Sequence, residues 1–138
     1  MGSGLEPGRG GIAVSKKIMI ITEAVKMEAE LNDSKTAALI WEALPINADV
    51  STWGDEIYFA IPVKTGPENA VSVVQKGDLV YWPEGNCFCI FFGKTPASTD
   101  TEIKPASPVN LVGRFSGDPE LWKKVAAGNT IRLEAARD

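Results

Sequence analysis

The commonest partner for nucleophilic and acid–base catalysis is missing from this sequence. Its 138 residues include no histidine, so neither a Ser-His nor a Cys-His pair can form. A Ser-Lys pair stays open, although no spacing marks one. Asp55 and Glu56 are adjacent carboxylates that follow Gly54, and neighbouring residues of a strand face opposite sides. We therefore interpret Asp55 and Glu56 as a solvated turn.

The two cysteines, Cys87 and Cys89, are two positions apart in an apolar run. On a strand their side chains point to one face, with their Cα atoms about 6.6 Å apart, which is marginal for a disulfide. We interpret them as buried free thiols. A metal site would need further thiolate or imidazole ligands, and no glycine-rich phosphate loop follows a strand. We therefore expect no metal and no cofactor.

Aromatic and polar side chains near strand ends are the remaining candidates for a binding site. Most of the large rings should pack in the core, but Trp53 and Trp82 lie beside Gly or Pro turns, where strands leave a sheet. A ligand pocket is mostly apolar and needs only a few polar groups. The residues predicted to bind a ligand are Trp53, Tyr58, Trp82, Phe91, Thr95, Asn110 and Arg114.

Asn110 and Arg114 are four residues apart in an expected strand, so strand parity places them on one face. An arginine that faces a barrel interior must be paired or bind an anion, because a lone buried charge is very costly. The alternative is an arginine that points outward into solvent. The sequence leaves both open.

Composition and charge describe an ordinary soluble domain, with 44% hydrophobic residues, 23% charged residues and a net charge of -4. No cluster of lysine and arginine can follow a phosphate backbone, so we expect no nucleic-acid partner. No apolar run approaches the roughly 20 residues of a membrane helix, so we expect no membrane partner and a cytoplasmic location. Residues 1–15 are expected to form a flexible or vector-derived tail, and residues 16–138 a single domain.

Sequence patterns beyond the tail predict a mainly β protein. Alternating apolar and polar residues, together with the continuous apolar run from Cys87, predict eight strands. They are expected at 17–22, 26–31, 46–53, 56–62, 78–82, 87–93, 109–116 and 130–135, with 70–74 as a shorter candidate. Up to eight antiparallel strands can close into a barrel filled by side chains. The strand at 87–93 is apolar on both faces and should be covered on both.

Two short helices should cap the open ends of this barrel. Ala37, Ile40, Trp41 and Leu44 recur at helical spacing and end before Pro45, because a residue before proline is pushed out of the helical region. Asp118 and Pro119 form a typical start for a second helix. The long polar stretch 94–108 should be an ordered surface loop, and loops of this length are often functional.

Four motifs carry a resemblance to a known family. They are Thr52-Trp-Gly-Asp-Glu-Ile-Tyr-Phe59, Gly77-Asp-x-x-Tyr-Trp-Pro-x-Gly-Asn86, Phe91-Phe-Gly-Lys-Thr-Pro96 and Pro108-Val-Asn-x-x-Gly113. With them the chain resembles the small bacterial and archaeal cyclophilin-like proteins, a domain family first catalogued as of unknown function. The resemblance implies a closed eight-stranded cyclophilin-like barrel with two short capping helices. It implies no established activity.

Three hypotheses for the function are open. The leading one is a binding module for a small molecule or an extended peptide, which is suggested by aromatic residues near turns in a chain without a catalytic histidine base. A divergent peptidyl-prolyl isomerase is the second, although the Phe-His-Arg and Gly-Ser-Gln-Phe-Phe patterns of true cyclophilins are absent and only Arg114 and Arg132 lie in barrel strands. The third is an enzyme on small amides or carboxylates with Arg114 as the anion anchor. The last two rest on fold analogy, which does not carry function by itself.

Overall fold

The computed structural model describes residues 16–136, so the predicted tail at residues 1–15 lies outside the described residues. Within these residues the chain forms nine strands, one α-helix and one 3-10 helix. In order these are β1 (Lys16–Thr22), β2 (Lys26–Leu31), α1 (Lys35–Ala43), β3 (Ile46–Asp49), β4 (Ser51–Thr52), β5 (Glu56–Ala60), β6 (Asp78–Trp82), β7 (Cys87–Phe91), β8 (Asn110–Phe115), η1 (Pro119–Lys124) and β9 (Thr130–Ala135). No helix of this described part is long and apolar enough to cross a membrane.

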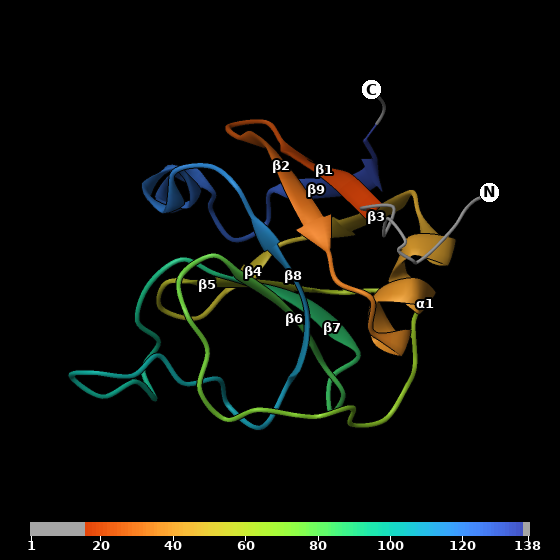
Figure 1. Cartoon of the computed structure of the whole chain (residues 1–138). Coiled ribbons are helices and arrows are strands. Elements are labelled where there is room, and N and C mark those ends of the chain that lie inside the picture. The colour runs from red at the N-terminus through yellow and green to blue at the C-terminus, as the bar shows by residue number, and fades with distance from the viewer. Residues whose placement is uncertain (1–15, 137–138) are drawn as a thin grey trace.

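All strand pairs are antiparallel, and the strands follow the order β3-β9-β1-β2-β8-β6-β7-β5-β4 in one sheet. The two edge strands of this sheet, β3 and β4, are consecutive in the chain. Strand β3 pairs with β9 at one edge, and β4 pairs with β5 at the other. The sheet therefore curls into a nearly closed barrel, with β8 crossing between its upper and lower halves (Figure 1).

The predicted eight-stranded closed barrel is wrong in its strand count. The expected strand 46–53 changes partner at Val50, whose side chain is buried. The Val50 N–H donates to the Asn129 carbonyl, and the Val50 carbonyl accepts from the Gly128 N–H, each at 2.8 Å. The chain therefore bends between the two halves of the barrel, which makes two short strands of one. The stretch 70–74 forms only isolated bridges, Val71 to Val109 and Val74 to Ile103.

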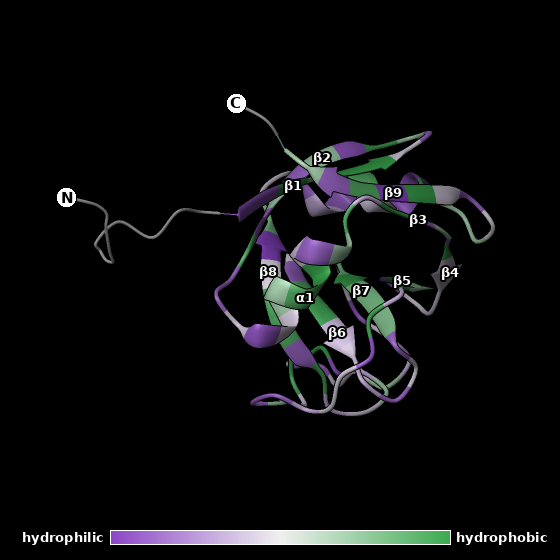
Figure 2. Cartoon of the chain, turned by 90° about the vertical axis from the view of Figure 1, so that its right-hand side faces the viewer, coloured by the Kyte–Doolittle hydropathy of each residue, from purple (hydrophilic) through white to green (hydrophobic). Residues whose placement is uncertain are grey.

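Both predicted helices are present. Helix α1 begins after Ser34, whose side chain accepts from the Ala37 N–H, and ends before Pro45. It lies across one open end of the barrel, in front of the hydrophobic strands β6 and β7 (Figure 2). The second helix is a 3-10 turn, η1, capped by Asp118. Its Trp122 is fully buried against Phe115, with ring centroids 5.9 Å apart.

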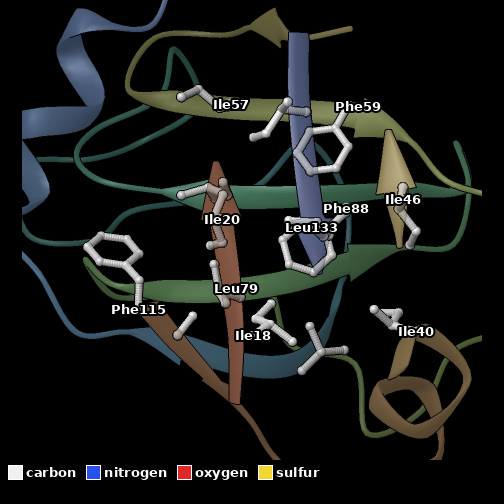
Figure 3. Packing of buried hydrophobic residues seen from close by; sticks show 14 of the residues in the cluster. Ile18, Ile20, Ile40, Ile46, Ile57, Phe59, Leu79, Phe88, Phe115 and Leu133 are labelled. Atoms are coloured by element: carbon white, nitrogen blue, oxygen red, sulfur yellow. The ribbon is translucent and has the colours of Figure 1, made fainter. Parts of the chain in front are cut away.

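The interior of the barrel is filled by buried apolar side chains. Phe59 and Phe88 stack there with ring centroids 5.4 Å apart. Side chains from β1, β9 and α1 meet those of β5, β6 and β7 in this core, including Ile18, Leu133 and Ile40 (Figure 3). A binding site must therefore lie on the outside of the barrel.

The prediction that β7 is covered on both faces is confirmed. All five of its residues are buried. Phe88 and Ile90 point into the barrel, whereas Cys87, Cys89 and Phe91 belong to a second apolar cluster on the outer face. The long connections 61–77 and 92–109 run on the side of β5, β6 and β7 that faces away from β1, β2 and β9 (Figure 1). This covered outer face is where the candidate site lies.

Candidate functional site

A pocket of about 280 Å³ opens on the outer face of the β5–β7–β6 part of the sheet. We call it the aromatic pocket. Its lining comprises Trp53, Glu56, Tyr58, Trp82, Cys89, Pro105, Ala106 and Val109. Tyr58 of β5 is paired with Cys89 of β7, so the two are neighbours on the floor. Residues from five separate chain segments therefore converge on one small apolar space, which is the usual form of a ligand site.

Trp82 is held rigidly at the edge of this pocket. Its indole N–H donates to the Ser107 hydroxyl at 2.6 Å. Its ring lies directly on the backbone of Gly85, where a Cβ atom would collide with the six-membered ring. A ring fixed by both contacts loses little freedom on binding a ligand.

Trp53 lies at the start of the β4–β5 turn, which is tied to the covering loop. The Asp55 N–H donates to the Lys94 carbonyl at 2.9 Å, and the Phe92 N–H donates to the Asp55 carbonyl at 3.0 Å. Gly54, with φ of +62°, packs so closely on Lys94 and Pro96 that a Cβ atom would lie 2.8 Å from the Lys94 carbonyl oxygen. The turn and the loop therefore form one rigid wall.

Thr95 and Ser98 fasten the two ends of the loop that covers the pocket. The Thr95 hydroxyl donates to the Lys104 carbonyl at 2.6 Å, and the Ser98 hydroxyl accepts from the Lys104 N–H at 3.1 Å. These bonds place Pro105 and Ala106, which follow directly, over the outer face of the sheet. The prediction that 94–108 is an ordered loop is confirmed.

Glu56 supplies the carboxyl group of the pocket. Only 6% of the residue is exposed, and this burial raises its pKa from 4.5 to about 7; a hydrogen bond from the Cys89 side chain opposes the rise. None of the lining residues is a lysine or an arginine. At neutral pH this carboxyl can therefore serve as either a proton donor or a proton acceptor.

Cys89 is a packing residue and not a nucleophile. It is fully buried, and both burial and the neighbouring Glu56 raise the pKa of its thiol well above the ordinary value. Burial also raises the pKa of the Cys87 thiol. Because the thiolate is the reactive form, neither cysteine is activated. Both are free thiols, as the sequence predicted.

Trp53, Tyr58 and Trp82 are the predicted site residues that the structure brings together. Phe91 is fully buried in the outer apolar cluster and lies beneath the loops. Thr95 is buried and engaged in fastening the loop.

Asn110 belongs to a different part of the molecule. Its side-chain amide donates to the Thr36 hydroxyl and to the Gly66 carbonyl, each at 3.1 Å, and its oxygen accepts from the Glu68 N–H at 2.9 Å. Glu68 in turn accepts from the Lys35 and Thr36 N–H groups at the start of α1. Asn110 therefore helps to attach the 61–77 connection to the helix.

The prediction that Asn110 and Arg114 share a face is wrong. Leu79 pairs with Gly113 and the next residue of β6, Val80, pairs with Leu111, so Val112 is an extra residue in a β-bulge. A bulge shifts the inside–outside alternation by one position. Asn110 is buried, whereas the Arg114 side chain is 55% exposed.

Arg114 lies outside the aromatic pocket. Its guanidinium pairs with the Asp78 carboxylate and donates to the Lys76 carbonyl at 2.7 Å. It lines a separate open groove with Asp78, Leu111 and Val73. Of the two orientations that the sequence left open, the structure has the outward one.

Glu56 is the functional residue that sequence reasoning missed, because the interpretation as a solvated turn is wrong for it. The sequence could have indicated this, because Glu56 and Tyr58 are two residues apart on one strand and therefore point to the same, outer face of β5. The partner strand β7 is apolar on its outer face too, so the outward side of β5 is covered along with it. Within residues 16–136, no three His, Cys, Asp or Glu side chains gather in a way that could hold a metal ion.

Comparisons with known proteins agree with this fold. A family model described as cyclophilin-like matches residues 16–134. The chain belongs to the cyclophilin-like family. No curated protein matches the sequence.

Two solved structures resemble this cyclophilin-like chain. The solution structure of the hypothetical protein AF2241 from Archaeoglobus fulgidus is 40% identical in sequence, with a TM-score of 0.77; the match covers 92% of this chain and 99% of that one. The structure of McbB in complex with tryptophan is 16% identical, with a TM-score of 0.65, and the match covers 88% of this chain and 46% of that one. The second likeness is one of fold alone.

Proposed function

We propose that this cyclophilin-like protein binds a small organic molecule in the aromatic pocket, as a binding protein without strong catalysis. The observation that carries the proposal is the convergence of Trp53, Tyr58 and Trp82 around one buried carboxyl, Glu56. Aromatic side chains offer large apolar contact areas, and one polar group can orient the ligand. An activated nucleophile is absent from the described lining residues.

The size of the pocket indicates a ligand of one or two rings. Its volume of about 280 Å³ is roughly twice the ~150 Å³ of an engineered apolar cavity that binds benzene. McbB, which shares the fold, was solved with tryptophan, a molecule of this size. At 16% identity that likeness extends to the fold, so the proposal rests on the pocket of this chain.

The two alternatives from the sequence have weaker geometric support. A prolyl isomerase of the cyclophilin type needs an arginine beside an apolar pocket. The other alternative, an enzyme on small amides or carboxylates, needs Arg114 in the pocket as its anion anchor. Arg114 lines a different groove and is already paired with Asp78. A protease-coupled assay on an Ala-Pro peptide tests the first alternative, with a rate above background as the result that would revive it.

Tryptophan fluorescence tests the proposal directly, because two of the four tryptophans line the pocket. A panel of one- and two-ring compounds should include ligands that change the emission of the wild type. Trp82→Phe should lose most of this response, whereas Trp41→Phe should keep it, since Trp41 belongs to α1 and packs against the barrel core. A panel that leaves the emission unchanged, or a response lost equally in both variants, would refute the proposal.

A further inference from the structure

We propose that the aromatic pocket selects organic cations, namely a substituted ammonium group carried on an apolar body of one or two rings. Glu56 would be the counter-charge, and Trp53, Tyr58 and Trp82 the aromatic surround. This inference rests on the proposed function, because it names the class of ligand for the same pocket.

The charge balance of the pocket is the first argument. Only 6% of Glu56 is exposed, yet none of the lining residues carries a positive charge. Among the described residues, no lysine or arginine forms an ion pair with Glu56; the two described arginines pair with Asp78 and Glu134. A buried carboxylate without a positively charged partner is costly, even where it accepts a hydrogen bond such as that from Cys89. A ligand cation would supply the partner that the chain lacks.

The aromatic rings are the second argument. A cation within about 6 Å of a Trp or Tyr ring is attracted by the negative face of the ring. Trp53, Tyr58 and Trp82 line the same pocket as the Glu56 carboxyl, and clusters of aromatic rings are used to recognise substituted ammonium groups. The apolar remainder of the lining, Pro105, Ala106 and Val109, would contact the body of the ligand.

The same lining disfavours ligands that carry a carboxylate. An anion in the pocket would meet Glu56 with no lysine or arginine to compensate, and like charges at close range repel. A zwitterionic amino acid would have its own carboxylate left without a partner. We therefore expect the pocket to prefer an amine over both the corresponding acid and the corresponding amino acid.

The groups around Glu56 leave it as the titrating group of the pocket near neutral pH. The titratable side chains that face it are Cys89 and Cys87 of β7 and Tyr58 of β5, while β4, Pro105 and Ala106 contribute none. Burial raises the pKa of both thiols, which keeps them uncharged. The pKa of Glu56 itself is about 7, so binding of a cation should strengthen as the pH rises through this value.

Isothermal titration calorimetry on the full chain with three matched probes tests the inference. They are trimethyl(2-phenylethyl)ammonium, whose charge does not titrate, 2-phenylethanol, which is neutral, and 3-phenylpropanoate, which is an anion. At pH 8 the ammonium probe should bind roughly tenfold more tightly than the alcohol, and the propanoate should bind most weakly. From pH 8 to pH 6 the ammonium affinity should fall by about tenfold, as Glu56 becomes protonated, while the alcohol affinity should stay constant.

Glu56→Gln should remove both the preference for the ammonium probe and its pH dependence. Glu102→Gln, on the exposed part of the covering loop, is the matched control and should keep both. Should Glu56→Gln fold poorly, the pH series of the wild type decides the question alone. Tighter binding of the alcohol or the acid, or an ammonium affinity that is flat with pH, would overturn the inference and leave the proposed function standing. If no probe or panel compound binds, both fail.

Discussion

Replacement of Glu56 by glutamine should stabilise the protein at alkaline pH, although it removes the one charged side chain of the pocket. Glutamine has nearly the shape of a protonated glutamic acid but cannot ionise. In the wild type, the pKa of Glu56 is raised from 4.5 to about 7 because burial disfavours the carboxylate. The folded protein therefore holds a proton that the unfolded chain has already released between these pH values.

The sign and size of the effect follow from this difference. A pKa that is raised in the folded state gives stability that is complete below pH 4.5, the ordinary value, and lost as the pH rises through about 7. From 4.5 to about 7, at about 1.4 kcal/mol per pH unit, the loss is about 3 kcal/mol. The Glu56→Gln variant would not suffer this loss, because its amide stays neutral throughout.

Urea denaturation of wild type and Glu56→Gln, measured between pH 4.5 and pH 8.5, is the assay. The free energy of unfolding of the variant, relative to wild type, should rise by about 3 kcal/mol across this range, most of it below pH 7.5. Glu42→Gln, an exposed position on α1, should show no such trend. A difference that is flat with pH would show that Glu56 ionises as an ordinary carboxyl, and it would remove the electrostatic basis for the site.

Three further predictions test the frame of the barrel and the site. Phe88→Ala should lower the free energy of unfolding by about 3–5 kcal/mol, because it opens a cavity at the centre of the core; a loss below about 1 kcal/mol in urea titrations would contradict the packing. Gly54→Ala should destabilise the chain by about 1–3 kcal/mol and weaken ligand binding, since the pocket wall must shift; unchanged stability and affinity would show that the wall is soft. Glu68→Gln should lower the melting temperature at neutral pH, because hydrogen bonds from α1 lower the pKa of this carboxyl. That stabilisation is present above the ordinary pKa of the carboxyl and is lost as the pH falls through its pKa in the folded protein. A difference in melting temperature between wild type and Glu68→Gln that stays the same in acid would contradict this prediction.

Local sequence patterns predicted most of the elements. Alternation or a continuous apolar run correctly predicted strands β1, β2, β6, β7 and β9. A strand buried on one face has an apolar residue at every second position, and a strand buried on both faces is apolar throughout. The start of α1 at Ser34 and its end before Pro45 follow from capping and from the restriction before proline. The surface positions of Trp53 and Trp82 follow from the adjacent turns.

Two tertiary features were out of reach of such patterns. The change of pairing partner at Val50 depends on the distance between β9 and β5 across the barrel. The bulge at Val112 depends on how β8 fits against β6, and it places Asn110 and Arg114 on opposite faces where strand parity predicted one shared face. Register shifts of one residue leave no local signal, yet they exchange the two faces of a strand.

The sequence by itself therefore determined a mainly β barrel with two short helices, and it determined that His-dependent chemistry is excluded. Only the tertiary structure decided where a ligand can bind. From the sequence, the Glu56 carboxyl beside the Gly54 turn is expected to be solvated. In the structure, the loop fastened by Thr95 and Ser98 covers it. Burial is a property of the packed chain, and burial is what raises the pKa of Glu56 to about 7 and gives the pocket its chemical character.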